Sequence, residues 1–486
     1  MTLPPAHALL RRCYDAAVAG VSPAPRTREH TAAWLARRAS AAPVHILALG
    51  KAAVAMTDGA VAALHDAGQQ PAGGLVIAAH HPATVPAWSA HLPIKVGDHP
   101  IPDIGSLAAA DAIAAAIAQV DAGDDVLVLL SGGTTALCAA PCAELSAAVG
   151  HPADAQRTIA DAVASMLARG LAIHEMNAIR RRLLRWGGGR LATALAARGV
   201  RDITVFAISD VIGDDASVIG SGPCTPDPYT ADDVLALCDA YGLRAQLDAP
   251  LLRALGLAGS GAALITPPPA SHPAFVRVSH TVIARNTDAC EAAANAARRD
   301  GVRQVVIADE VLEGDAAALG VAIARVALRH AINEPDEWLL VWGGEPTVVL
   351  TDDEDDEDAL SAVVADAPDE PPLGGRMQAL ALAAALALQS AEALVPFDAM
   401  DDAATHAARL TILAAGTDGR DGPTDAAGAI VDAVTVPLVH RAGRDADVYL
   451  QRHRSYHALH AADALLHTGP SGTNVMDLVL VHLRAL

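Results

Sequence analysis

Short apolar segments alternate with longer alanine-rich segments along most of this chain, and this alternation restricts the fold more than any other feature. Residues 44–49, 125–130 and 203–208 have the length of buried strands, and each ends in a loop of glycine or polar residues. The segment 107–120 has the length and apolar spacing of a helix. Strands separated by helices pair in parallel, and helices then cover both faces of the sheet. The sequence therefore predicts an α/β fold with a mostly parallel sheet.

Two or three domains are expected from a length of 486 residues. The best boundary candidate is the segment 266–273, because three prolines follow one another at 267–269. The alternation of strands and helices resumes after this segment. We therefore predict an N-terminal domain over residues 1–265 and a C-terminal domain over residues 275–486.

Composition and charge exclude several classes of protein. A net charge of -22 argues against general binding of nucleic acid. The six cysteines are scattered, so neither a disulfide framework nor a zinc site is expected. Arg11 and Arg12 interrupt any signal-peptide core, and the longest apolar run, 379–388, is too short to cross a bilayer. We expect a soluble cytoplasmic protein without membrane contact, and its state as monomer or homodimer is left open.

The loop 416–428 contains three aspartates and four glycines and follows the apolar segment 410–415, a predicted strand. Backbone N–H groups and carboxylates converge where such a strand ends. Open α/β sheets bind phosphorylated ligands and their metals at this edge. A turn alone needs one or two glycines, so this pattern favours a functional loop.

Three further polar loops follow predicted strands in the N-terminal half. Lys51 lies between a predicted strand and a predicted helix, where a lysine can reach a phosphate. The same position equally fits an exposed lysine without a role in binding. Residues 131–135 read Ser-Gly-Gly-Thr-Thr and fit either a turn or a nest of N–H groups for an anion. Asp210 ends a buried strand, where its carboxylate can hold magnesium or accept a hydroxyl proton.

Two motifs flank the acidic segment 352–358, itself expected to be a solvated loop. Gly343-Gly344-Glu345 follows the predicted strand 338–342. Arg376 opens a predicted helix, where its guanidinium can bind a carboxylate or phosphate through two hydrogen bonds. The chain contains no G-x-x-x-x-G-K-[ST], so it is not a P-loop kinase, and no strand is followed by G-x-G-x-x-G.

The segment 417–428 resembles the signature of the type II glycerate kinases, whose C-terminal part is the MOFRL domain. Gly50-Lys51-Ala52, residues 209–215 and Gly374-Gly375-Arg376 resemble other segments of that family, so the resemblance covers nearly the whole chain. It implies a Rossmann-like α/β/α N-terminal domain and a smaller C-terminal α/β domain, with the MOFRL region over about 335–486. It also implies ATP- and Mg²⁺-dependent phosphorylation of D-glycerate, and it favours the 2-hydroxyl, which would give 2-phosphoglycerate.

The resemblance also implies roles for individual residues, in a cleft that we expect between the two domains. Lys51 would stabilise charge on the phosphates, and Arg376 would bind the glycerate carboxylate or a phosphate. Asp210 is the third expected catalytic residue, and Mg²⁺ would bind Asp210 or Asp418. Whether Asp210 or Asp421 orients the attacking hydroxyl is left open by the sequence. The residues expected to bind the nucleotide are Ser131, Gly132, Gly133, Thr134, Thr135, Gly344, Glu345, Thr417, Asp418, Gly419, Asp421 and Asp425.

Several positions depart from the family pattern. Residues 180–184 read Arg-Arg-Arg-Leu-Leu where the family commonly has Arg-Lys-His-Leu-Ser, Gly187 replaces a lysine, and Ile104 replaces a usual glutamate. Met377 also differs, and His99 fits a turn or core histidine. These changes keep three alternatives open: a kinase of another small sugar acid, an NAD(P)H-dependent hydroxypyruvate reductase, and a ligand-binding protein without catalysis.

Overall fold

The computed structural model describes residues 4–38, 41–169, 171, 173–245, 247, 249–255, 265, 267–348, 370–395 and 402–486. The acidic segment 352–358 and Thr266 lie outside these residues. The chain forms two compact units, one over Ser22–Ala284 and one that joins the residues up to Val21 to Arg285–Leu486. The division between the units therefore differs from the expected boundary. The helix over residues 5–20 belongs with the C-terminal half, and the strand over residues 278–284, after the proline run, belongs with the N-terminal half.

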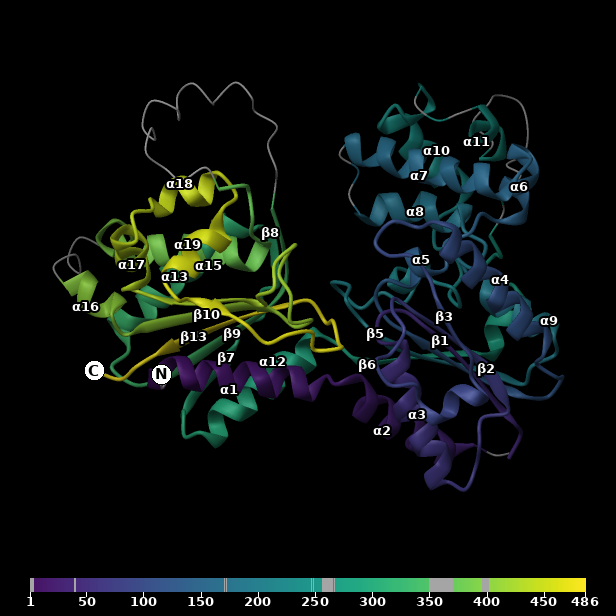
Figure 1. The fold of residues 1–486 in the computed structure, drawn as a ribbon, viewed down its shortest axis with the longest axis horizontal. Helices are drawn as coiled ribbons and strands as arrows, with labels where there is room; N and C mark the ends of the chain where they lie inside the picture. Colours follow the sequence, from purple (N-terminus) through teal and green to yellow (C-terminus); the bar gives the residue numbers. More distant parts are fainter. Residues whose placement is uncertain are drawn as a thin grey trace. The chain divides into compact units, whose positions relative to one another are not determined.

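A six-stranded sheet forms the centre of the unit Ser22–Ala284, and all its strands are parallel (Figure 1). The strand order is β3-β2-β1-β4-β5-β6, which is the Rossmann-type order and confirms the predicted fold class. The strands β1 and β4 are buried at every residue, as continuous apolar segments require. The bounds are β1 (Val44–Leu49), β2 (Gly73–Ala78), β3 (Ile94–Val96), β4 (Asp125–Leu130), β5 (Asp202–Ile208) and β6 (Val278–Ala284).

Helices cover both faces of this sheet. Helices α2 (Pro23–Arg37) and α3 (Ala53–Asp66) pack together on one face, and α4 (Ile104–Ala118) and α9 (Arg190–Ala197) pack on the other. A separate helical cluster has its own apolar core. It is formed by α6 (Ala143–Val149), α7 (Pro152–Ala168), α8 (Ile173–Leu183), α10 (Ala231–Ala240) and α11 (Ala249–Ala254). Short helices complete the unit: α5 (Thr134–Leu137), η1 (Ala87–Ala90), η2 (Ile219–Ser221), η3 (Leu243–Ala245) and η4 (Pro273–Arg277).

The second unit contains a mixed sheet in the order β12-β11-β10-β13-β9-β7, with β8 also paired to β9. Only β7 and β8 run parallel to β9, and the other pairs are antiparallel. The apolar segments 304–308, 338–342, 410–415 and 475–482 predict four of these strands, and β8, β11 and β12 were not predicted. The bounds are β7 (Gln304–Ile307), β8 (Leu312–Asp315), β9 (Trp338–Thr347), β10 (Leu410–Gly416), β11 (Gly428–Asp432), β12 (Leu465–Leu466) and β13 (Asp477–Leu483).

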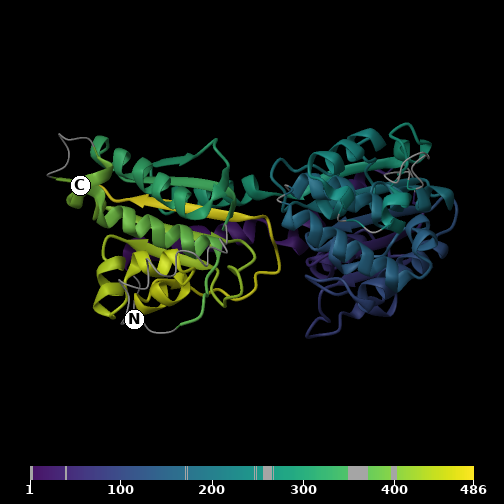
Figure 2. The ribbon, with the colours of Figure 1, turned by 90° about the horizontal axis from the view of Figure 1, so that it is seen from above.

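Helices α1 (Pro5–Gly20) and α12 (Asn286–Arg299) cover one face of the mixed sheet, and α13 (Ala316–Asn333) and α15 (Arg376–Gln389) cover the other (Figures 1 and 2). A Cβ atom on Gly320 of α13 would lie 2.3 Å from the Leu380 carbonyl oxygen, so the two helices pack at close range. The alanine-rich sequence of α15 permits this contact. The remaining helices are η6 (Ala391–Leu394), α16 (Ala403–Ala407), α17 (Thr435–Arg441), α18 (Ala446–Gln451) and α19 (Ser455–Ala461).

The longest apolar run of the sequence lies in α15 and is almost entirely buried in the core of its unit. It packs there against α13, β10 and β11. None of the helices in the described part of the chain is both long enough and apolar enough to cross a membrane.

Candidate active site

In the unit Ser22–Ala284, the loops after β1 and β4 meet at the carboxyl edge of the parallel sheet. These strands are neighbours, and the strand order reverses between them. Open α/β sheets bind ligands in the crevice at such a reversal. The Lys51 N–H donates to the Gly132 carbonyl at 2.9 Å, and the Ala52 N–H donates to Ser131 Oγ at 3.0 Å. The structure thus brings together two loops that the sequence singled out separately.

Glycines allow charged side chains to lie against the loop after β4. A Cβ atom on Gly132 would lie 2.0 Å from Asp210 Oδ2, so the carboxylate occupies the space beside that backbone. A Cβ atom on Gly133 would lie 3.1 Å from Lys51 Cγ, and Gly133 has a φ of 84°. The loop therefore has an exposed lysine and a partly buried aspartate next to its backbone.

The hydroxyl groups of this loop hold its shape. Thr134 Oγ1 donates to the carbonyls of Leu49 at 2.9 Å and Ser131 at 2.8 Å. Thr135 Oγ1 and Ser221 Oγ lie 2.8 Å apart. Ser131 and Thr134 are buried, so their hydroxyls fix the loop between β1 and β4. Any ligand contact of this loop falls chiefly to its backbone and to the charged neighbours.

His99 is a residue of this site that the sequence analysis assigned to a turn or core. A Cβ atom on Gly133 would lie 3.2 Å from His99 Cδ2, so the imidazole lies beside the same glycine as Lys51. The pKa of His99 is lowered by desolvation first, and then by the positive charges of Lys51 and His80. The imidazole is therefore neutral at neutral pH and offers one donor and one acceptor.

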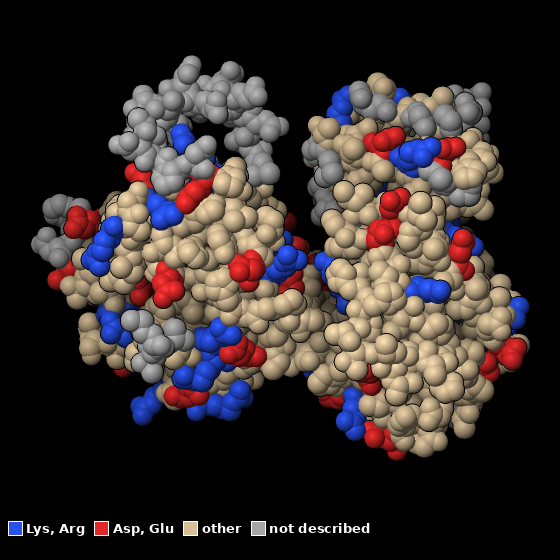
Figure 3. All heavy atoms as spheres, viewed as in Figure 1, with Lys and Arg blue, Asp and Glu red and all other residues tan. Residues whose placement is uncertain are grey.

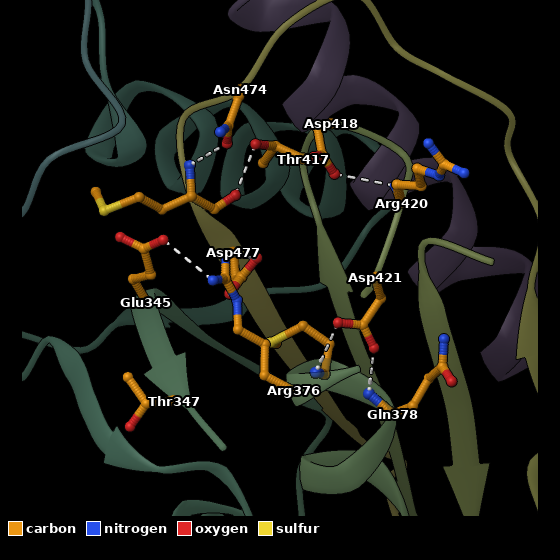
Figure 4. A network of polar contacts seen from close by, with 12 residues as sticks. Glu345, Thr347, Arg376, Gln378, Thr417, Asp418, Arg420, Asp421, Asn474 and Asp477 are labelled. Atoms are coloured by element: carbon orange, nitrogen blue, oxygen red, sulfur yellow. Dashed lines mark hydrogen bonds and ion pairs between the residues drawn. The ribbon is translucent and has the colours of Figure 1, made fainter. Parts of the chain in front are cut away.

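In the second unit, Arg376 lies at the first turn of α15 and contacts two carboxylates (Figure 4). Its Nε donates to Asp477 Oδ2 at 2.6 Å, and its second terminal nitrogen donates to Asp477 Oδ1 at 3.3 Å. The remaining terminal nitrogen donates to Glu345 Oε1 at 3.1 Å. This geometry fixes the plane of the guanidinium group.

Burial shapes the charges of this network. Asp477 is 2% exposed, and burial raises its pKa to about 7, although Arg376 acts in the opposite direction. Burial alone would lower the pKa of Arg376, but Asp477 and Glu345 raise it well above its ordinary value. Arg376 is therefore charged and held between two acidic side chains.

Sequence reasoning missed Asp477. The available signal was an acid at the start of the otherwise apolar strand β13, three residues after the Gly- and Ser-containing loop 469–474. Glu345 was expected in a loop after a strand, but β9 continues through it to Thr347. A Cβ atom on Gly344 would lie 2.3 Å from the Leu312 carbonyl, so this glycine permits the close pairing of β9 with β8.

Asp421 caps the helix that carries Arg376. Its Oδ1 accepts the Met377 N–H at 3.1 Å, and its Oδ2 accepts the Gln378 N–H at 2.7 Å. These N–H groups have no partner inside the helix. Asp421 is 3% exposed, and burial raises its pKa to about 6. The contact ties the loop after β10 to the first turn of α15.

The free energy of unfolding should fall as the pH rises from about 4 to about 7. Asp421 and Asp477 have native pKa values of about 6 and about 7, above the ordinary aspartate value of about 3.9. The native state therefore binds more protons than the unfolded state in this interval, and stability is lost as the two groups ionise. Urea denaturation at about pH 5 and about pH 7.5 measures this loss.

Asp421→Asn removes one of the two titrating groups and should make stability less dependent on pH. The matched control is Asp425→Asn in the same loop, because Asp425 is exposed and its pKa is lowered, mainly by its hydrogen bond with Tyr456. An unchanged pH dependence in Asp421→Asn would contradict the assignment.

Other residues of the loop after β10 mainly contact nearby segments of the same unit, above all residues 469–476. Thr417 Oγ1 donates to the Met476 carbonyl at 2.6 Å and accepts the Val475 N–H at 2.9 Å. A Cβ atom on Gly419 would lie 2.1 Å from the Gly469 carbonyl oxygen, which keeps this position free of a side chain. Asp418 Oδ1 accepts the Arg420 N–H at 3.0 Å, and the Tyr456 hydroxyl donates to Asp425 Oδ1 at 2.8 Å.

The two predicted magnesium ligands belong to different units, Asp210 to Ser22–Ala284 and Asp418 to the other. Across the described ranges, no three His, Cys, Asp or Glu side chains form a group that could hold a metal ion.

The arginines of α8 lie in the helical cluster. Arg181 and Arg182 are buried, and their guanidinium nitrogens lie 3.7 and 3.2 Å from the carboxylate of Asp227. Arg190 donates to the carbonyls of Arg181 at 3.1 Å and Leu184 at 3.2 Å. These contacts connect α8 to Asp227, which precedes α10, and to Arg190, the first residue of α9.

Comparison with known proteins identifies two matching families. The family described as a domain of unknown function, DUF4147, matches residues 9–256, and the MOFRL family matches residues 338–477. The first match alone covers half of the chain. Together they include all three residues that were expected to be catalytic.

Relatives and solved structures agree with these matches. The D-glycerate 2-kinase of Thermotoga maritima is 29% identical over 90% of each chain. A putative hydroxypyruvate reductase of Agrobacterium vitis is 33% identical over 97% of this chain and 93% of its own length. The crystal structure of a glycerate kinase from Thermotoga maritima has a TM-score of 0.76 and 28% identity, and the alignment covers 99% of this chain and all of that one.

Proposed function

Because this chain belongs to the glycerate kinase family in which a MOFRL domain follows a DUF4147 domain, we propose that it transfers the γ-phosphoryl group of ATP to D-glycerate. The proposed acceptor is the 2-hydroxyl, which gives 2-phosphoglycerate. A relative from Pyrococcus horikoshii that is 31% identical is named a glycerate 2-kinase, which supports this position.

The observation that carries the proposal is the arrangement around the loop after β4. Lys51 and Asp210 lie against Gly133 and Gly132 at the point where the strand order reverses. Phosphoryl transfer needs positioning and neutralisation of charge more than covalent chemistry. Lys51 would neutralise phosphate charge, backbone N–H groups would bind phosphate oxygens, and Asp210 would accept a hydrogen bond from the attacking hydroxyl.

Of the two aspartates considered for orienting the hydroxyl, Asp210 is the better candidate. Both carboxylate oxygens of Asp421 already accept backbone N–H groups of α15, and the side chain is buried. Asp421 would then act indirectly, since it holds the helix turn that begins with Arg376.

The donor set fits a magnesium ion that arrives with the nucleotide. Mg²⁺ in kinases is commonly bound by one or two carboxylates together with phosphate oxygens and water, so a preformed group of three ligands is not required. Asp210 or Asp418 would supply the protein oxygen. When bound, the ion would neutralise charge on the phosphates.

Arg376 is proposed to bind the carboxylate of glycerate or a phosphate oxygen. Asp477 and Glu345 fix the plane of its guanidinium group, and about a third of the side chain is exposed. A guanidinium group has five N–H donors, so its contacts with Asp477 and Glu345 leave donors for an anionic ligand.

The proposal is tested by ADP release from the purified full chain with MgATP and D-glycerate, followed by enolase treatment of the product. ADP that depends on glycerate and a product that enolase consumes are the expected results. ADP release without an enolase substrate would reject the 2-hydroxyl. No glycerate-dependent ADP from folded protein would reject the kinase assignment for this acid, and a panel of hydroxy acids would then identify another acceptor.

A second candidate activity, the reduction of hydroxypyruvate, comes from the name of the Agrobacterium vitis relative. A hydroxypyruvate reductase would oxidise NADH or NADPH, but the sequence has no G-x-G-x-x-G after any predicted strand. Loss of absorbance at 340 nm with hydroxypyruvate is the assay, and we expect none above the rate without enzyme.

A further inference from the structure

A second concave surface lies in the unit Ser22–Ala284, at the amino edge of the parallel sheet. It is lined by the start of β5, the start of β6 and the last turn of α2. Lys51 and Asp210 follow the carboxyl ends of β1 and β5, so this pocket is at the opposite edge of the same sheet. Its volume is about 390 Å³, within the range of about 300–1,000 Å³ that is usual for small-molecule sites.

Four guanidinium groups line the pocket, although the chain carries a net charge of -22. On the face of the molecule in Figure 3, by contrast, basic and acidic side chains are interspersed on a mostly uncharged surface. Asp202 also lines the pocket, so its charge is mixed but mainly positive, and an excess of one sign attracts ions of the opposite sign. The four arginines are Arg37, Arg38, Arg201 and Arg277.

Two of these arginines are neutralised by acids and two are not. Arg38 and Arg201 both bind the buried carboxylate of Asp125, and Arg201 Nε also lies 3.3 Å from Asp202 Oδ2. Within the described residues, neither Arg37 nor Arg277 pairs with a carboxylate, and Arg277 donates only to the Val200 carbonyl. The pocket therefore keeps an excess of positive charge.

One nitrogen of Arg38 is buried beside the pocket without a hydrogen-bond partner in the described part of the chain. The nitrogen is Nε, and the Arg38 side chain is 6% exposed. A buried donor without an acceptor is destabilising, and such groups are rare in native proteins. Because this nitrogen is shielded from solvent, a ligand in the pocket would reach it only if the Arg38 side chain moved.

The rest of the lining suits an organic ligand. The Arg38 guanidinium lies 4.7 Å from the ring centroid of Trp34, so an aromatic side chain borders the charged groups. Ser279 Oγ and Thr204 Oγ1 lie 3.4 Å apart at the starts of the two strands and add hydroxyl donors. The pocket lining thus combines charged guanidinium groups, two hydroxyl groups and an aromatic side chain.

We propose that this pocket binds a small organic phosphate. A phosphate monoester has nearly two negative charges at neutral pH and three terminal oxygens, which match guanidinium donors from different elements. Its carbon part would lie against Trp34. Such a ligand would connect the end of α2 to β5 and β6, away from the loops assigned to phosphoryl transfer.

The test is isothermal titration calorimetry of the full chain with glycerol 3-phosphate and, separately, with inorganic phosphate. The buffer contains no other phosphate or sulfate. Glycerol 3-phosphate should bind at one saturable site, more tightly than inorganic phosphate. Arg37→Ala and Arg277→Ala should each weaken binding by about tenfold, since each removes a charged hydrogen-bond donor. Thermal denaturation checks that the variants fold.

Two control variants make the test specific. Arg28→Ala removes an exposed arginine of the same helix α2, which pairs with Asp66 outside the pocket, and should leave binding unchanged. Lys51→Ala should also leave binding unchanged, because Lys51 lies at the opposite edge of the sheet. Weaker binding in Lys51→Ala would mean that the ligand occupies the proposed phosphoryl-transfer site instead. The proposal is overturned by absence of saturable binding below about 10 mM, by equal affinity for inorganic phosphate, by equal losses in Arg28→Ala, or by loss in Lys51→Ala.

Discussion

Arg376→Ala should lower kcat/KM for D-glycerate by about 100- to 1,000-fold, the usual effect of removing a charged donor that stabilises a transition state. Arg376 is the group best placed in its unit for this work, because Asp477 and Glu345 fix its orientation through hydrogen bonds of 2.6 and 3.1 Å. Steady-state kinetics with varied glycerate and varied MgATP would measure the loss and show which substrate Arg376 serves.

Folding must be separated from catalysis in this variant, because Arg376→Ala leaves the buried Asp477 without its partner. The expected structural cost is below the usual cost of breaking a fully buried ion pair, about 3–5 kcal/mol, because about a third of the Arg376 side chain is exposed. Arg376→Lys keeps the charge but loses the two-point contact, so it should fold better and still be strongly impaired. A folded Arg376→Lys protein within about tenfold of the parent would refute the need for a guanidinium.

Lys51→Ala should lower kcat by about 100-fold or more, without a comparable loss of stability. Lys51 is exposed, and its backbone N–H bond to Gly132 does not need the side chain. The loss would come from missing neutralisation of phosphate charge in the transition state. The ADP-release assay measures kcat, and thermal denaturation measures stability.

The chain offers a close control for this experiment, because its only other lysine, Lys95, is exposed on β3 of the same unit. Lys95→Ala should retain the parent rate. If Lys51→Ala turns over within about tenfold of the parent, a difference of ~1.4 kcal/mol, the assigned role of Lys51 is wrong.

The parallel sheet could be predicted because its central strands are continuous apolar segments. Such segments are recognisable without tertiary information, and β1 and β4 were found with their correct bounds. The same reasoning placed Lys51 and the Ser131 loop each after its own strand, and the pairing of β1 with β4 brings them to one edge, since adjacent parallel strands end at the same side. Strand β8 escaped prediction because Leu-Glu-Gly-Asp has no apolar pattern and is exposed beyond Leu312.

The network around Arg376 could not be predicted because it depends on strand register. Asp477 lies opposite Gly344 in the antiparallel pair of β13 and β9, which places it next to Glu345. Arg376 is 101 residues away from Asp477 in the sequence. The glycines before Glu345 suggested the end of a strand, but β9 continues through them. Gly343 is needed there for space, because a Cβ atom on it would lie 1.6 Å from Asn286 Oδ1. No local pattern reports such neighbours.

Helix α1 has a consequence for synthesis of the protein. Its Tyr14 hydroxyl donates to the Gly416 carbonyl at 2.7 Å, and the helix packs on β13, which ends at Leu483. Helix α1 is therefore synthesised long before β13 and must wait for it, whereas the unit Ser22–Ala284 has all its own strands much earlier. A fragment that begins at Arg285 would lack α1 and expose the sheet face that α1 covers, so the two halves cannot be separated by a single cut.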